Sequence, residues 1–170
     1  MMELMTDPRA VPRVTSVGAD LDELFRREGD GLYRTLVAFT GGRVAIAEDA
    51  TAEAFARAIA HEGQLRDPIA WIYRVAFRAA TDEIRHERRS AASNIETDAV
   101  VAPPELGGVI EALRKLSPNQ RAAVVLRHVL DLDVDDVAAR MGIASPTVRV
   151  HLHRARRRLR ALLGDEEADR

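Results

Sequence analysis

The sequence contains no cysteine, no long hydrophobic run, and only one tryptophan, two tyrosines and four phenylalanines among its 170 residues. The lack of thiols excludes disulfides and thiolate metal sites. No apolar stretch approaches the roughly 20 residues of a membrane span, and residues 1–20 lack the apolar core of a signal peptide. These absences predict a cytoplasmic protein that does not insert into membranes. Small apolar residues dominate instead, which favours close helix packing and predicts an all-α fold.

Lysine is also nearly absent, because Lys115 is the only lysine among 25 basic residues, against 27 acidic ones. With a net charge of −2, any nucleic-acid site must be a local patch. Such a patch lies near the end of the chain, where no acidic residue occurs between Asp136 and Asp165. A helix with charges of one sign indicates an anionic partner, and the simpler alternative is a basic helix that only confers solubility. The basic residues of this interval are Arg140, Arg149, His151, His153, Arg154, Arg156, Arg157, Arg158 and Arg160.

The same interval has the pattern of a helix-turn-helix. A short helix is expected over residues 134–141, and Gly142 suits the left-handed residue that ends it. Ser145 is expected to cap a second helix, with Pro146 at its first position. A stripe of apolar residues at helical spacing is expected to pack inward. It consists of Val148, Leu152, Ala155, Leu159 and Leu162.

The opposite face of the second helix is the candidate reader of a DNA major groove. Once the apolar stripe is buried, Arg149, Val150, His153 and Arg154 face outward in the first half of the helix. An arginine there can form a bidentate contact to guanine, and Val150 can pack on a thymine methyl group. The arginines further along the helix are expected to reach phosphate at most.

Composition divides the rest of the chain into two helical domains. A first domain is expected over residues 20–89 and a second over residues 109–164, with a flexible linker over residues 90–108 that contains Pro103-Pro104 and lacks an apolar stripe. Residues 1–19 are expected to form a tail and residues 165–170 a frayed acidic end. Expected helices cover residues 20–40, with an irregularity at residues 29–31, then 44–60, 68–89, 109–116 and 118–129. Apolar side chains expected to pack inward include Phe25, Ile59, Trp71 and Val129.

Two charged faces are expected in the first domain. Glu48, Asp49 and Glu53 share one face of the second helix and suit a basic partner, although a solvated acidic face is the simpler alternative. Basic residues gather on the third helix and can neutralise phosphate, while Trp71, Tyr73 and Phe77 can stack on unpaired bases. Trp71 and Phe77 are nevertheless more often core residues. The basic residues of this helix are Arg74, Arg78, Arg85, His86, Arg88 and Arg89.

With both domains placed, the chain resembles bacterial RNA polymerase sigma factors of the extracytoplasmic-function (ECF) group. Residues 47–59 (AEDATAEAFARAI) are similar to that group's region 2 motif AEDLVQETFLRAW, and residues 67–85 are similar to PRAWLYRIARNLALDALR. Residues 116–127 (LSPNQRAAVVLR) are similar to LPPRQREVLLLR. The helix-turn-helix, with VAARMG, TVR and LHRAR, is similar to EIAEILGCPVGTVKSRLHRAR. The four similarities occur in the group's order from about Leu21 to Leu163.

The resemblance implies a protein that directs core RNA polymerase to promoter DNA and catalyses no reaction itself, with no cofactor or metal. It implies that Glu48, Asp49 and Glu53 dock on the polymerase, and that region 2 captures the minus-ten element. It places a flipped promoter base in the loop that contains Gln64 and Arg66. Region 4 would read the minus-thirty-five element through Arg149, Val150, His153 and Arg154, and the resemblance adds Thr147 to this set. Because the group is commonly held inactive by an anti-sigma factor, such a partner is implied as well.

Three departures from the group's pattern bear on promoter preference and on the strength of polymerase binding. They are Ala52 in place of Gln, Phe77-Arg78 in place of Arg-Asn, and Val150 in place of Ser. Two other functions stay open from the residues alone. A stand-alone helix-turn-helix regulator would bind palindromic DNA as a dimer. A helical enzyme would hold a metal on Glu48, Asp49 and Glu53. Asp131-x-Asp-x-Asp135 lacks the glycine and glutamate of a calcium loop, and residues two apart, such as His151 and His153, point apart on a helix.

Overall fold

The computed structural model describes residues 17–61, 63–90 and 107–164, and this part of the chain contains seven helices and no strand. The predicted all-α fold is therefore confirmed. The helices are α1 (Val17–Thr40), α2 (Val44–Ala60), α3 (Pro68–Ser90), α4 (Gly107–Arg114), α5 (Pro118–Val129), α6 (Val134–Met141) and α7 (Ser145–Leu163). Residues 1–16 of the predicted tail, residues 91–106 of the predicted linker and the acidic end lie outside the described residues. Residues 17–19, predicted in the tail, begin α1, and residues 90, 107 and 108, predicted in the linker, belong to α3 and α4.

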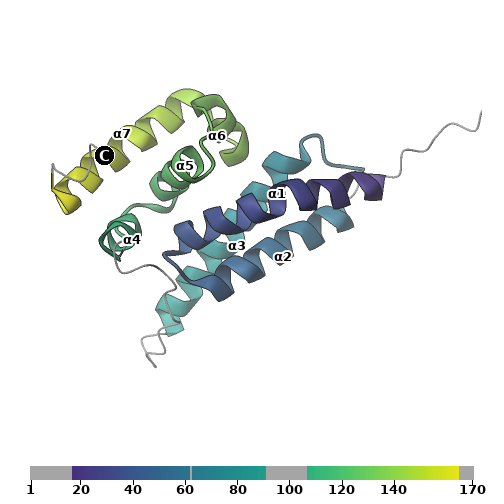
Figure 1. Ribbon diagram of the computed structural model, residues 1–170, viewed down its shortest axis with the longest axis horizontal. Helices are drawn as coiled ribbons and strands as arrows, with labels where there is room; N and C mark the ends of the chain where they lie inside the picture. Colours follow the sequence, from purple (N-terminus) through teal and green to yellow (C-terminus); the bar gives the residue numbers. More distant parts are fainter. Residues whose placement is uncertain (1–16, 62, 91–106, 165–170) are drawn as a thin grey trace, which may run out of the picture.

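The first three helices lie side by side and form an N-terminal bundle (Figure 1). Its core contains fully buried Leu32, Leu36 and Ile72. The chain turns from α1 into α2 at Gly41 and Gly42, both at positive φ. Asp67 caps α3 as predicted, because its Oδ1 accepts from the Ala70 backbone N–H at 3.0 Å.

Two predictions for this bundle are wrong. The first helix is continuous through Gly29 and Gly31. Gly31 serves packing instead: a Cβ there would lie 3.2 Å from a methyl group of Leu130, so its absence lets α1 and the end of α5 approach closely. Phe25 and Ile59, expected inward, are 51% and 59% exposed. Phe25 still makes an edge-to-face contact with the buried ring of Phe55.

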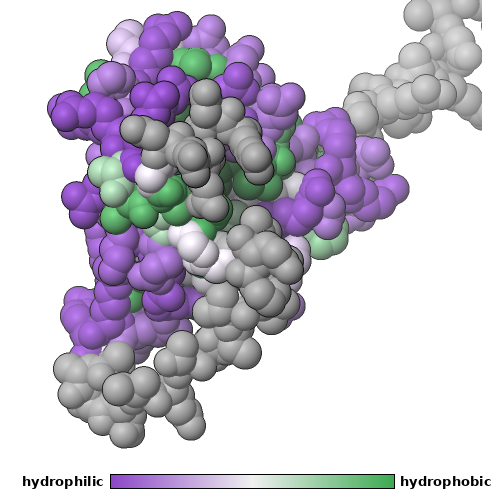
Figure 2. Space-filling view, turned by 60° about the vertical axis from the view of Figure 1, so that its left-hand side comes forward, coloured by the Kyte–Doolittle hydropathy of each residue, from purple (hydrophilic) through white to green (hydrophobic). Residues whose placement is uncertain are grey.

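The last four helices form a C-terminal bundle whose helix ends follow local sequence signals. Ser117 and Gln120 make a reciprocal capping box at the start of α5. Asp133 caps α6, and Gly142 ends it in the predicted left-handed conformation at φ 67°. Figure 2 brings the α4 and α7 end forward and shows mostly hydrophilic side chains around a smaller hydrophobic area.

Three expectations for the C-terminal bundle need correction. Ser145 does not cap α7, because the helix already includes it and Ala144 is the N-cap. The Ser145 hydroxyl instead donates to Asp135 Oδ1 and ties the second helix of the motif to the first. Val129 and Leu162, expected inward, are 40% and 43% exposed, each in the last turn of its helix.

The two bundles pack against each other and share one hydrophobic core, an arrangement that the sequence did not predict. Helix α5 lies on α1, and α6 lies on α3 (Figure 1). Two arginines of the C-terminal bundle face aromatic rings of the N-terminal bundle. The Arg121 guanidinium lies 5.4 Å from the Phe39 ring centre, and that of Arg140 lies 5.1 Å from the Tyr73 ring centre.

Candidate nucleic-acid interface

Helix α7 has the two faces that its sequence predicts. Val148 and Ala155 are buried and Leu152 and Leu159 half-buried, which fixes the rotation of the helix on the bundle. The candidate reading residues are then all exposed on the outer side of its first three turns. They are Thr147, Arg149, Val150, His153 and Arg154.

The charge of α7 is available to a partner. Within the described residues no arginine of α7 makes an ion pair, so this helix presents uncompensated positive charge. His151 points away from the reading face: it is half-buried and its Nδ1 has no partner among the described residues. Burial, and then the charges of Arg127 and Arg156, lower the pKa of His128 below its ordinary value, so it adds little charge at neutral pH.

The basic residues of α3 are exposed, and four of them lie along the junction between the two bundles. Arg74, Arg78 and Arg85 line a cavity of about 420 Å³ together with Asn119, Arg140 and Met141, among others. Arg85 and Arg88 line a second cavity beside it. The basic stripe of α3 therefore faces the C-terminal bundle. His86 and Arg89 are exposed and line neither cavity.

The aromatic residues of α3 are less accessible than base stacking requires. Tyr73 is 1% and Phe77 9% exposed, and Phe77 makes an edge-to-face contact with Phe39 in the core. Burial, followed by the charge of Glu28, raises the pKa of Tyr73. Only Trp71 is half-buried, with its ring 5.6 Å from that of His61. Tyr73 and Phe77 cannot stack on bases in this arrangement.

Gln64 and Arg66 lie exposed in the loop between α2 and α3, so this segment is accessible to a ligand. Glu48, Asp49 and Glu53 are exposed on α2, as their spacing predicts. Glu53 also pairs with Arg57 one turn later, at 2.5 Å. The described residues contain no group of three or more His, Asp or Glu side chains that could hold a metal ion. None of the described helices is long and apolar enough to cross a membrane.

Gly142, in the turn of the helix-turn-helix, lies close to Arg74 of α3. A Cβ on Gly142 would lie 2.8 Å from Arg74 Cδ, and its φ of 67° disfavours other side chains. We expect Gly142→Ala to lower the free energy of unfolding by about 1–2 kcal/mol, the cost of a left-handed alanine. Gly107→Ala is the matched control, because nothing lies near its Cβ position and its φ is not positive. Equal denaturation midpoints for the two variants would show that neither the left-handed conformation of Gly142 nor the space beside it requires glycine.

Sequence reasoning missed Arg121, Arg140 and the junction that they form. Arg121 is 5% exposed, although its neighbours gave no sign that this position of α5 is buried. Its Nη1 donates to the Phe39 carbonyl oxygen at 2.9 Å, across the junction. Arg140 approaches Glu28 of α1 at 3.9 Å. Only the packing of α5 and α6 on the N-terminal bundle identifies these contacts.

Comparison with known proteins identifies both bundles. The family model described as Sigma-70 region 2 matches residues 24–90, and the one described as Sigma-70, region 4 matches residues 106–159. The chain is 32% identical over 137 residues to the RNA polymerase sigma factor CarQ of Myxococcus xanthus, covering 74% of this chain and 79% of that protein. It is 31% identical over 183 residues to the ECF RNA polymerase sigma factor BldN of Streptomyces coelicolor, covering 98% of this chain and 67% of that protein.

Solved structures share the fold. The sigma factor RpoE of Bartonella quintana, in complex with the anti-sigma factor NepR, superposes with a TM-score of 0.69 at 22% identity, covering 86% of this chain and 98% of that one. CnrH, in complex with the cytosolic domain of CnrY, superposes with a TM-score of 0.68 at 24% identity, covering 89% and 92%. Because the sequence identities to these two structures are below 25%, their similarity to this chain shows only that the fold is shared.

Proposed function

Because this chain belongs to the ECF group of bacterial RNA polymerase sigma factors, we propose that it recognises its promoters through a division of labour between the two bundles. The N-terminal bundle, within residues 20–89, docks on core polymerase and binds the minus-ten element. The C-terminal bundle, within residues 109–164, reads the minus-thirty-five element, and residues 90–108 tether the two. The chain acts in the cytoplasm as a non-enzymatic initiation factor without metal or cofactor. An anti-sigma factor is proposed as its regulatory partner.

The observation that best supports this proposal is the exposed basic face of α7 on the second helix of the motif. Thr147, Arg149, Val150, His153 and Arg154 reach a major groove from the first half of that helix. The acidic face of α2 supports the part of the proposal that concerns docking on core polymerase. Glu48, Asp49 and Glu53 lie on the other bundle, so that one chain contacts DNA and a basic protein surface at once.

The minus-ten element is assigned to α3 and the loop before it. Arg74, Arg78, Arg85 and Arg88 form a basic stripe that follows a phosphate backbone, with His86 and Arg89 beside it. Asp82 interrupts the stripe and pairs with Arg78 at 3.9 Å and with Arg85 at 3.6 Å. In this proposal Gln64 and Arg66, both exposed in that loop, hold an unpaired base. The stripe lies along the junction with the C-terminal bundle, but its side chains are exposed there, so DNA can reach it from the open side of the junction.

Binding to purified core polymerase, followed by run-off transcription on genomic fragments, tests the function as a whole. Transcripts that begin at discrete sites only when this chain is present would support it. DNA binding as a dimer on a palindrome, without any association with polymerase, would instead identify a stand-alone regulator.

The reading face makes a separate prediction. We expect Arg154→Ala to cost about 1–3 kcal/mol on the cognate promoter and to relax the preference at one base position, because a bidentate guanine contact is lost. Arg158→Ala is the matched control on the same exposed helix. It should weaken all sequences about equally or have no effect. Transcription from a promoter library with each holoenzyme measures both, and a uniform loss for Arg154→Ala would show that the assigned face is wrong.

A further inference from the structure

A basic cavity lies where the end of α3 meets the turn between α4 and α5. Its volume is about 630 Å³. Thr81, Ile84, Arg85 and Arg88 of α3 form one wall, and residues of both bundles complete it. The opposite wall and the floor are formed by Phe39, Glu111, Arg114, Lys115, Leu116, Ser117, Pro118 and Arg121.

The charges around this cavity are not balanced. Arg85, Arg88, Arg114, Lys115 and Arg121 line it, and Glu111 is the carboxylate in the lining. Arg85 also pairs with Asp82, which lies outside the lining, at 3.6 Å. Five cations thus face two carboxylates. Glu111 approaches Arg114 and Lys115 at 3.5 and 3.3 Å, so one carboxylate serves two cations. The N-terminus of α5, at Ser117 and Pro118, adds the positive end of a helix dipole.

The deepest of these cations is Arg121, which is 5% exposed. Its Nη1 donates to the Phe39 carbonyl, and its Nη2 donates to those of Arg114 and Leu116 at 3.0 and 3.3 Å. Its Nε has no partner among the described residues. Burial, and then the charges of Arg88, Arg114 and Arg43, lower the pKa of Arg121 to about 10. A buried cation is thus held by neutral carbonyls in a field of further cations.

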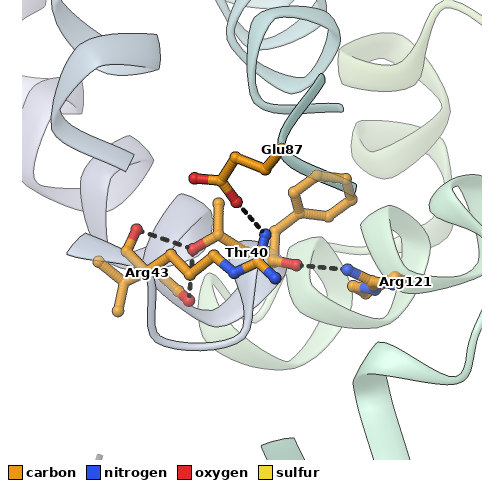
Figure 3. A network of polar contacts seen from close by, with 6 residues as sticks. Thr40, Arg43, Glu87 and Arg121 are labelled. Carbon is orange, nitrogen blue, oxygen red and sulfur yellow. Dashed lines mark hydrogen bonds and ion pairs between the residues drawn. The ribbon is translucent and has the colours of Figure 1, made fainter. Parts of the chain in front are cut away.

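A polar network at the end of α1 lies next to Phe39 and Arg121 of the cavity lining (Figure 3). The Thr40 hydroxyl bonds to the carbonyls of Val37 and Arg43, each at 3.1 Å, and holds the turn into α2. Arg43 pairs with Glu87 of α3 at 2.6 Å. Because Glu87 is engaged by Arg43, it does not neutralise Arg88 or Arg121, and the cavity keeps its positive charge.

We propose that this cavity binds a small anion carrying two or more phosphate groups, and that the bound anion holds the two bundles together. Several convergent cations favour a multiply charged ligand over a single-charged one. The volume falls within the range of small-molecule sites and exceeds the space that one phosphate needs. Because both bundles supply the lining, the anion binds only to the packed arrangement and shifts the population toward it.

Pyrophosphate is the probe for this proposal, titrated into the free full-length chain at constant ionic strength. At about one hundred times its Kd, the midpoint of thermal unfolding should rise by about 5–10 °C. A second readout follows the bundles directly. Because the chain has no cysteine, dyes placed through Ala56→Cys on α2 and Ala161→Cys on α7 report on their separation. Pyrophosphate should raise the mean efficiency of energy transfer between the two dyes and narrow its distribution.

Matched variants locate the binding. Arg114→Gln with Lys115→Gln removes two cations from the lining and should raise the apparent Kd at least about tenfold. Arg114→Lys with Lys115→Arg keeps the charge and should retain the response. Arg156→Ala with Arg157→Ala removes the same charge from exposed positions of α7 outside the cavity and should leave the response unchanged.

Three results would overturn the proposal. The first is no midpoint shift at millimolar pyrophosphate, and the second is an equal shift in both charge-removing variants. The third is an equal response to sulfate, which would indicate an adventitious ion only. All arms use the free chain, so their outcome is independent of polymerase binding.

Discussion

Replacing both Asp49 and Glu53 by lysine is expected to weaken association with core RNA polymerase by at least about 2 kcal/mol, a roughly thirtyfold rise in Kd. Both carboxylates are exposed on α2, one turn apart, on the face proposed to dock on a basic surface of the polymerase. Reversal replaces attraction by like-charge repulsion across the same contact. Equilibrium binding to purified core polymerase measures the effect, and the wild-type affinity should fall more steeply with salt than that of the variant.

The fold should tolerate this change. Glu53 loses its ion pair with Arg57, but both side chains are largely exposed, and such pairs contribute at most about 0.5 kcal/mol. Asp22→Lys with Glu23→Lys is the matched control, because it makes the same charge change on α1 and also breaks one exposed pair, Glu23–Arg26. Equal polymerase affinity for the two double variants would show that the acidic face of α2 does not dock.

Local signals made the helix-turn-helix predictable. A capping aspartate at Asp133, a left-handed glycine at Gly142 and the apolar spacing around Val148 each act within a few residues, so the sequence displays them directly. The exposed reading face follows, because burial of one stripe fixes the rotation of the helix. Ser145 shows the limit of this reasoning: its hydroxyl bonds to Asp135, ten residues away, instead of capping its own helix.

The packing of one bundle on the other was not predictable in the same way. Contacts between Gly31 and Leu130, or between Arg140 and Tyr73, join residues about seventy or more positions apart, and neither partner carries a local signal. Helical periodicity also does not show where a neighbouring helix ends. Ile59, Val129 and Leu162 therefore continue their apolar stripes into solvent.

The junction changes how the basic stripe of α3 is understood. From the sequence, Arg74, Arg78 and Arg85 were expected to gather on one surface of the third helix and to neutralise phosphate. In the structure they line a cavity with Asn119, Arg140 and other residues of the C-terminal bundle. The junction also places Arg140 over the Tyr73 ring and the turn of the helix-turn-helix beside Arg74. The surroundings of the stripe thus depend on how the two bundles pack, and Arg121 is the residue whose hydrogen bonds span both bundles.

Arg121→Ala is expected to lower the free energy of unfolding by about 2–4 kcal/mol, because three carbonyl oxygens lose a charged donor. Two of these carbonyls lie within the C-terminal bundle, and the third, that of Phe39, lies in the other bundle. The loss should therefore also weaken the junction and lower the energy transfer between dyes on α2 and α7. Chemical denaturation and the same labelled pair measure the two effects.

Two further variants test whether the hydrogen bonds of Arg121 or its charge stabilise the junction. Arg121→Lys keeps the charge but lacks the planar fork, so it should recover only part of the stability. Arg157→Ala removes an exposed arginine and should change stability by no more than about 0.5 kcal/mol. If Arg121→Ala behaved like Arg157→Ala in both measurements, Arg121 would not hold the junction. If Arg121→Lys fully restored stability, the positive charge would hold it, without the fork of hydrogen bonds.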